Sequence, residues 1–122
     1  MKKRILIAEN DEYLLQALMQ LLELEGFTTA GAPDGDAALG LAHQAAFDLI
    51  LLDFKMPGLH GLEALAGLRH LLPEVPIIMM SGQTGRHAVT DALRGGAFDF
   101  IMKPFNDEFV LLAVKRALGL AN

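Results

Sequence analysis

The stretch Leu49-Ile50-Leu51-Leu52-Asp53 decides the fold, because four consecutive apolar residues end abruptly at a carboxylate. The run is apolar at both alternating positions, and this pattern predicts a strand that is buried on both faces of a sheet. Three further short apolar runs also stop at polar side chains: residues 5–8 before Glu9, residues 77–80 before Ser81, and residues 100–102 before Lys103. Ligands of open α/β sheets bind beyond the carboxyl ends of parallel strands. We therefore expect acids, a hydroxyl and a lysine to converge at one edge, where they could hold a divalent cation and a phosphoryl group.

Helical patterns separate these runs. A helix is predicted over about residues 12–25, and Gly26 suits the position just after its end. Its apolar face would consist of Leu14, Leu18, Leu21 and Leu22. A weaker strand follows over residues 27–32. A second helix is predicted by an alanine-rich face of Ala38, Leu39, Ala42 and Ala45. Two more are predicted over residues 62–72 and 86–94. A last helix, capped by Asn106 or Asp107, would run through Leu118. Strand and helix alternate five times, which indicates a single doubly wound α/β domain with a parallel sheet and helices on both faces.

Composition narrows the classes of function. The chain has 122 residues, a formal net charge of −5 and no cysteine. The charge disfavours direct binding to nucleic acid or to an anionic membrane, and the lack of cysteine suits a reducing compartment. Only four apolar residues separate the basic N-terminus from Glu9, which is too few for a signal peptide, and no apolar run is long enough to span a membrane. We expect a cytoplasmic protein.

Each motif also has a simpler structural interpretation when it is taken alone. Asp48 and Asp99 begin strands at the opposite edge of the predicted sheet, where turn or cap roles are expected. Lys103 alone would fit a strand-end lysine whose apolar stem is buried. The six methionines fit core filling. The four histidines show no metal-ligand spacing, and we expect them on the surface: His43, His60, His70 and His87.

Taken together, the motifs resemble one known family. The motifs are Glu9-Asn10-Asp11, residues 51–58 (Leu-Leu-Asp-Phe-Lys-Met-Pro-Gly), Ser81-Gly82 and Lys103-Pro104-Phe105. In this order, at the ends of these strands, they resemble the receiver domain of bacterial two-component response regulators. The resemblance covers essentially the whole chain, residues 1–122. It implies a five-stranded flavodoxin-like (βα)5 fold with strand order 2-1-3-4-5. The domain would be a signalling module rather than an enzyme, and it would accept a phosphoryl group from a histidine kinase or phosphotransfer protein.

The resemblance also implies roles for individual residues. Asp53 would be the phosphorylated nucleophile. Mg²⁺ would be held by Glu9 (through water), Asp53, the backbone carbonyl of Lys55 and the position occupied by Asn10. Ser81 and Lys103 would bind the phosphoryl group, and Lys103 would first pair with Asp53. The Lys103–Pro104 peptide bond would be cis. Ser81 and Phe100 would form the switch, and the last strand and last two helices would meet a second copy or an output partner.

One departure from the family pattern concerns the metal. The family usually has a second acid after the first strand, and here Asn10 occupies that position. An amide oxygen can coordinate a hard cation, but one negative charge is lost. This loss keeps open an alternative, in which a degenerate receiver acts as an interaction module without phosphorylation.

Two rivals of other classes lack support in the sequence. A flavin-binding module would need a small-residue phosphate cradle after the first strand, where Glu9 and Asp11 stand instead. A phosphatase with an aspartate nucleophile would need a general acid two residues after Asp53, and that residue is Lys55.

Overall fold

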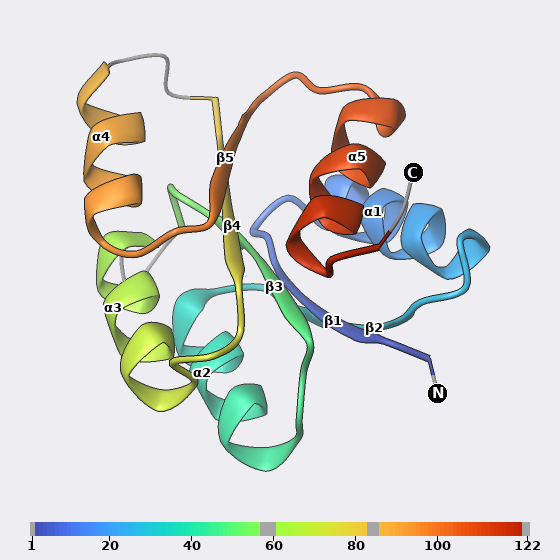
Figure 1. Cartoon of the computed structure of the whole chain (residues 1–122), viewed down its shortest axis with the longest axis horizontal. Coiled ribbons are helices and arrows are strands. Elements are labelled where there is room, and N and C mark those ends of the chain that lie inside the picture. The colour runs from blue at the N-terminus through green and yellow to red at the C-terminus, as the bar shows by residue number, and fades with distance from the viewer. Residues whose placement is uncertain (1, 57–60, 83–85, 121–122) are drawn as a thin grey trace.

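The structure is a computed structural model that describes residues 2–56, 61–82 and 86–120. Five strands and five helices alternate along the chain: β1 (Arg4–Ala8), α1 (Glu12–Leu24), β2 (Thr28–Ala32), α2 (Gly35–Gln44), β3 (Leu49–Asp53), α3 (Gly61–Leu71), β4 (Ile77–Ser81), α4 (Arg86–Arg94), β5 (Asp99–Met102) and α5 (Asp107–Ala117). Figure 1 shows this order by colour from the N-terminus to the C-terminus. The predicted alternation of strands and helices is confirmed.

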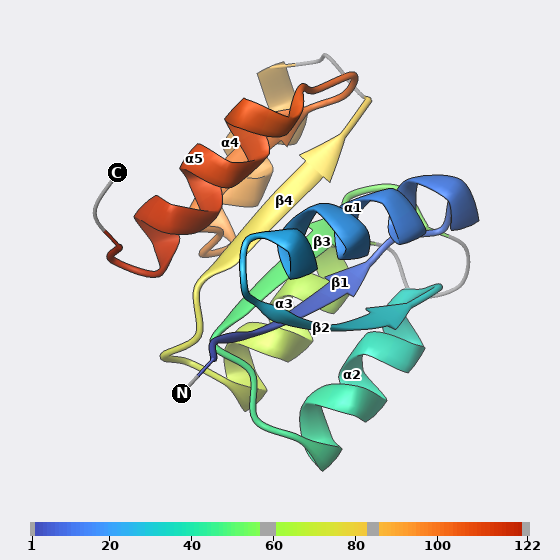
Figure 2. The same ribbon diagram turned by 90° about the vertical axis from the view of Figure 1, so that its right-hand side faces the viewer.

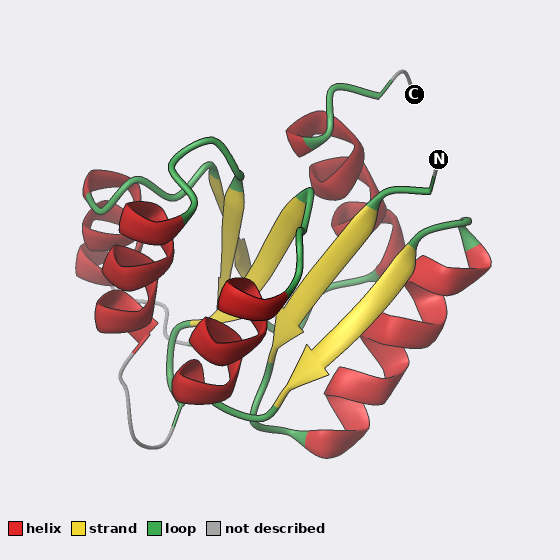
Figure 3. Cartoon of the chain, turned by 90° about the horizontal axis from the view of Figure 1, so that it is seen from below, coloured by secondary structure: helices red, strands yellow, loops and turns green. Residues whose placement is uncertain are grey.

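The strands form one parallel sheet in the order β2-β1-β3-β4-β5. Helices α1 and α5 lie together against one face (Figure 2), and α2, α3 and α4 cover the other (Figure 1). Figure 3 shows the resulting three layers, with the strands between two sets of helices. The strand order reverses between β1 and β3, so the ends of these two central strands are free to shape a crevice.

Alternate residues of the central strands belong to two different cores. On β3, Leu49 and Leu51 face the layer of α1 and α5, whereas Ile50 and Leu52 face the layer of α2, α3 and α4. All four side chains are fully buried. This double burial is the reason why the strand reads as an uninterrupted apolar run rather than as an alternating one.

The helix boundaries follow the capping signals in the sequence. The carboxylate of Asp11 caps α1 by accepting hydrogen bonds from two backbone amides of its first turn, and Asp34 and Asn106 cap α2 and α5. Gly26 and Gly96, which follow α1 and α4, have φ values of +96° and +99°, a conformation that favours glycine. The predicted helices therefore match the observed ones to within about one residue at the ends that both define.

Packing corrects one detail of α1 and shows which residues of α4 are buried. The buried face of α1 consists of Leu15, Leu18 and Leu22, whereas the sequence pattern placed Leu14 and Leu21 on that face. Both of those side chains are only half-buried, because they lie toward its margins. In α4 the buried residues are Ala88 and Ala92, and the larger Leu93 is 49% exposed.

Among the described residues, no helix is long and apolar enough to cross a membrane.

Candidate functional site

The candidate site lies where β1, β3, β4 and β5 end, and we call this side the carboxyl edge of the sheet. The parallel register pairs Ala8 with Leu52, so the chain positions that follow, Glu9 and Asp53, come side by side. Backbone hydrogen bonds fix the positions just beyond the strands. The Glu9 amide donates to the Ala32 carbonyl (3.0 Å), and the Lys103 amide donates to the Ser81 carbonyl (2.7 Å). Strands far apart in sequence thus deliver their polar side chains to one place.

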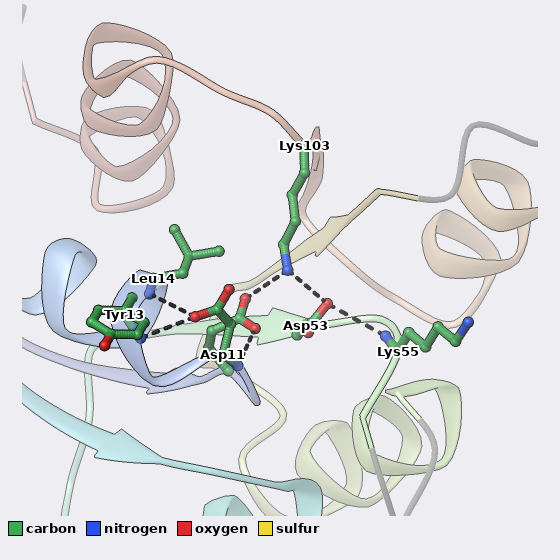
Figure 4. A network of polar contacts seen from close by, with 7 residues as sticks. Asp11, Tyr13, Leu14, Asp53, Lys55 and Lys103 are labelled. Carbon is green, nitrogen blue, oxygen red and sulfur yellow. Dashed lines mark hydrogen bonds and ion pairs between the residues drawn. The ribbon is translucent and has the colours of Figure 1, made fainter.

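A lysine bridges the two buried carboxylates of the site (Figure 4). The Lys103 Nζ lies 2.7 Å from Glu9 Oε1 and 3.4 Å from Asp53 Oδ1. The expected pairing of Lys103 with Asp53 is therefore present, but the shorter contact is with Glu9. The other oxygen of Glu9 accepts a hydrogen bond from the Asp11 amide at 2.9 Å. Both oxygens of Glu9 are engaged, so its carboxylate has a fixed orientation.

Asp53 differs chemically from an ordinary surface aspartate. It is only 4% exposed, and its Oδ1 accepts a hydrogen bond from the Lys55 amide at 3.4 Å. Burial raises the pKa of Asp53 from 3.8 to about 6, and the neighbouring Glu9 adds to the rise. Lys103 and the Lys55 amide favour the charged form and oppose the rise in pKa. At neutral pH, Asp53 is a desolvated carboxylate, which has little water to shed before it reacts.

The two residues that follow Glu9 have different tasks. The Asp11 Oδ1 accepts hydrogen bonds from the amides of Tyr13 (3.0 Å) and Leu14 (3.2 Å), so this carboxylate is committed to capping α1. Successive side chains of an extended chain point to opposite sides, and the cap agrees with this geometry. Asn10 is exposed and lines the same depression as Asp53. Within the part of the chain that the structure describes, no three acidic, histidine or cysteine side chains cluster around one point.

All of the predicted site residues except Phe100 line one depression, whose volume is about 400 Å³. It is lined by the site residues and their neighbours: Glu9, Asn10, Asp11, Asp53, Lys55, Ser81, Gly82 and Lys103. Ser81 is 1% exposed, and the side chain of Lys55 extends away from Asp53 (Figure 4). The Lys103–Pro104 peptide bond is cis, as expected. Phe100 is half-buried on β5 and lies away from the carboxylates.

Two aspartates and four histidines were expected to lie outside the site. Asp48 and Asp99 lie at the opposite edge of the sheet, as predicted. Asp48 accepts a hydrogen bond from the Arg4 amide, and Asp99 accepts one from the Phe100 amide. His43, His70 and His87 are exposed, and His60 lies outside the described residues. The sequence did not predict that one oxygen of Glu9 pairs with Lys103 and the other accepts the Asp11 amide. The pattern of residues shows which side chains converge but not which atoms are in contact.

The donor set suits a hard cation and a phosphoryl group. Two carboxylates and an amide oxygen are ligands that Mg²⁺ accepts, and proteins commonly hold this ion with only one or two carboxylates. Lys103 Nζ already places a positive charge between the two carboxylates, which shows that the site is built around cationic neutralisation. A buried aspartate paired with a lysine, with a serine lining the same depression at the switch point of a doubly wound sheet, is the arrangement that the resemblance to receiver domains implies.

Comparison with known proteins identifies the family. The family model described as the response regulator receiver domain matches residues 5–115. The chain is 36% identical over 117 residues to the regulatory protein AtoC of Escherichia coli (strain K12), an alignment that covers 96% of this chain and 25% of AtoC. It is 37% identical over 118 residues to the DNA-binding response regulator MtrA of Mycobacterium tuberculosis (strain ATCC 25618 / H37Rv), covering 97% of this chain and 51% of MtrA.

Solved structures agree with the sequence comparison. A CheY-like response regulator receiver domain protein from Methanospirillum hungatei JF-1 superimposes with a TM-score of 0.94 at 33% identity, covering 98% of this chain and 95% of that chain. The chain therefore belongs to the response regulator receiver domain family. It spans a quarter of the length of AtoC and about half of MtrA.

Proposed function

We propose that this receiver domain accepts a phosphoryl group on Asp53 from a histidine kinase or phosphotransfer protein in the cytoplasm. The observation that carries the proposal is the buried Asp53 carboxylate, held 3.4 Å from the Lys103 ammonium at the carboxyl edge of the sheet. Receiver domains are signalling modules that interact with such phosphodonors. This role makes Asp53 a phosphoacceptor whose product is a changed protein surface.

The chemistry follows from the positions of the side chains. An oxygen of Asp53 attacks phosphorus, the bond between phosphorus and the donor imidazole breaks, and the imidazole leaves with its electron pair. Lys103, which is already between Glu9 and Asp53, moves its positive charge toward the new phosphoryl oxygens. The Ser81 hydroxyl lines the same depression and donates to one of those oxygens.

Mg²⁺ fits the residues present. Glu9, Asp53, the Asn10 amide oxygen and the Lys55 carbonyl would hold it, and the bound ion would neutralise the charge that builds on the phosphoryl oxygens. The Asp11 carboxylate is not one of these ligands, because it caps α1. The Asp11 backbone amide instead donates a hydrogen bond to Glu9. The metal affinity then depends on two acids instead of three.

Labelling with radioactive acetyl phosphate and Mg²⁺ tests the proposal. The wild-type protein should become labelled, and the Asp53→Asn variant should not, because an amide is a poor nucleophile. Asp48→Asn is a matched control, since Asp48 is an exposed aspartate at the other edge of the sheet. Wild-type protein that takes up no label from acetyl phosphate or from any kinase would support the alternative, a receiver that acts without phosphorylation.

We also propose that the output surface consists of α4, β5 and α5. On α5, Phe109 is 64% exposed while Val110 and Val114 are buried. Phe100 and Phe109 line a cavity of about 530 Å³ between β5 and α5. Movement of Phe100 on phosphorylation would reshape this surface for a second copy or an output partner.

Backbone NMR shifts on adding beryllium fluoride with Mg²⁺ test this second proposal, because beryllium fluoride mimics a phosphoryl group. The shifts should extend from Ser81 to Phe109. Shifts confined to the neighbourhood of Asp53 would rule out a transmitted change. The net charge of −5 still predicts that this chain does not itself bind nucleic acid.

A further inference from the structure

Helix α3 begins in direct contact with the backbone that follows Asp53. Gly61, the first residue of α3, is buried, and its amide donates a hydrogen bond to the Phe54 carbonyl oxygen at 3.1 Å. A Cβ atom at position 61 would lie 2.1 Å from that oxygen, 2.6 Å from the carbonyl carbon and 2.7 Å from the Cα of Phe54. These are all backbone atoms, so they cannot swing aside as the end of a side chain can. Position 61 therefore accepts only a glycine without a shift of the backbone.

The requirement is for space and not for an unusual backbone conformation. The described glycines with positive φ are Gly26, Gly96 and Gly119, and Gly61 is not among them. A glycine used in this way marks a place where two backbone segments approach closely. Here the two segments are the start of a helix and the residue next to the proposed phosphoacceptor.

The hydrogen bond between Gly61 and Phe54 fixes the backbone of residues 54–55, which also contacts β4 and Asp53. The Phe54 amide donates to the Met80 carbonyl at 2.7 Å, and the Phe54 carbonyl accepts from Gly61. Strand β4 and helix α3 thus clamp this residue from both sides. The next amide, that of Lys55, donates to Asp53 Oδ1. The orientation of the Lys55 peptide therefore depends on where the Phe54 carbonyl is held.

We propose that Gly61 is a positioning residue for the phosphoacceptor site. The missing side chain lets α3 lie directly on Phe54, and this contact sets the direction of the Lys55 amide and carbonyl toward Asp53 and the cation. The proposal rests on the function proposed for Asp53. Small displacements of groups outside the reacting atoms can change rates about 100-fold, so such a contact is relevant to function.

Gly67 offers a matched control on the same helix. A Cβ at position 67 would meet only the side chain of Leu39, with its closest atom at 3.1 Å. A leucine methyl can move by the few tenths of an ångström required, and alanine is the better helix former. Gly67→Ala should therefore fold normally and leave the Lys55 peptide where it is.

The experiment compares wild type, Gly61→Ala and Gly67→Ala by two measurements on folded protein. The first is the amide NMR shift of Lys55 without metal, and the second is the dissociation constant for Mg²⁺. In Gly61→Ala the Lys55 resonance should move, and Mg²⁺ should bind about 10-fold more weakly, the usual effect of losing a residue that orients a metal ligand. Gly67→Ala should match wild type in both measurements. A merely structural role would lower the melting temperature and leave both quantities unchanged.

Each outcome decides the matter. A folded Gly61→Ala protein with the wild-type Lys55 shift and Mg²⁺ affinity overturns the proposal, as does an equal loss in Gly67→Ala. If Gly61→Ala is unfolded in buffer, both measurements are repeated in trimethylamine N-oxide, which favours compact states. Failure to fold even there assigns Gly61 to the fold and overturns the positioning role. Labelling of wild-type protein tests the function of Asp53 separately, and the metal-free Lys55 shift stands whatever that result.

Discussion

The two edges of the sheet carry the same kinds of charged residue in opposite environments. At the carboxyl edge, Glu9 and Asp53 are almost completely buried and share one lysine. At the amino edge, where the strands begin, Asp48 is exposed, and its Oδ2 accepts the Arg4 amide at 2.8 Å. The aspartate at the amino edge extends the strand ladder, whereas the one at the carboxyl edge is a desolvated carboxylate with a raised pKa. Burial, more than residue type, separates a structural carboxylate from a reactive one.

Removing the lysine of the carboxyl edge should give the largest effect on stability. Lys103→Met leaves two buried carboxylates without their counter-charge, and breaking a buried ion pair from one side costs about 3 kcal/mol or more. Urea unfolding at pH 7 in the presence of a chelator measures the loss. Lys115→Met is the control, because Lys115 pairs with Glu25 where both side chains are about one-third exposed, and such pairs contribute about 1 kcal/mol or less. Equal losses in the two variants would show that burial at the carboxyl edge does not strengthen the interaction.

The second prediction concerns pH. Because folding raises the pKa of Asp53 from 3.8 to about 6, the folded state binds more protons than the unfolded state between these values. The stability contribution of this group is therefore fully present below about pH 4 and is lost as pH rises through 6. At pH 7 the loss amounts to about 2 to 3 kcal/mol. Asp53→Asn should consequently be more stable than wild type at pH 7, with the difference vanishing near pH 4.

Chemical denaturation of both proteins across pH 4 to 8 without metal measures this difference. Asp48→Asn is the matched control for this substitution, because Asp48 is an exposed aspartate at the amino edge. A constant difference between wild type and Asp53→Asn at all pH values would mean that Asp53 is not desolvated. Labelling by acetyl phosphate should also slow below about pH 6, as the nucleophile becomes protonated.

The third prediction concerns the effect of Asn10, which stands where the family usually has an acid, on the affinity for Mg²⁺. Asn10→Asp adds a negative charge to the depression that holds Asp53, and two charges at 4 Å interact by about 4 kcal/mol at an effective dielectric near 20. Desolvation of the new carboxylate and loss of the amide ligand offset most of this, so we expect Mg²⁺ binding to tighten about tenfold, or about 1.4 kcal/mol. Gln20→Glu, an exposed change on α1, makes the same change in net charge. Equal affinities in the two variants would show that the residue-10 side chain does not contact the ion.

The sequence predicted the fold because every strand of the sheet's centre is buried on both faces. An apolar run such as residues 49–52 has one stable place in a protein of this size, and the polar residue that ends it must then lie at a strand end. Convergence of Glu9, Asp53, Ser81 and Lys103 follows from parallel topology alone. The family resemblance supplied the roles assigned to these residues, which topology could not.

Contacts between particular atoms could not be predicted in the same way. The pattern does not show that Lys103 lies closer to Glu9 than to Asp53, because that depends on side-chain conformations. It also gave Gly61 no function, since a glycine in a turn-rich segment is expected whether or not space is tight. The positioning role that we propose for Gly61 rests on its closeness to the Phe54 backbone. The contacts between individual atoms are therefore known only from the three-dimensional structure, whereas the set of residues that form the site can be predicted from the sequence.

The smallest effect is expected at the amino edge. Asp48→Ala removes the acceptor of the Arg4 amide but leaves the hydrogen bond from the Asp48 amide to the Arg4 carbonyl, which is 2.8 Å long. Arg4 is exposed, so water can replace the lost carboxylate, and the free energy of unfolding should fall by only about 1 kcal/mol. Mg²⁺ affinity and labelling of Asp53 should not change, because they depend on the other edge. Calorimetry and a metal titration measure both quantities, and a weakened Mg²⁺ site in this variant would mean that the two edges are coupled through the strands between them.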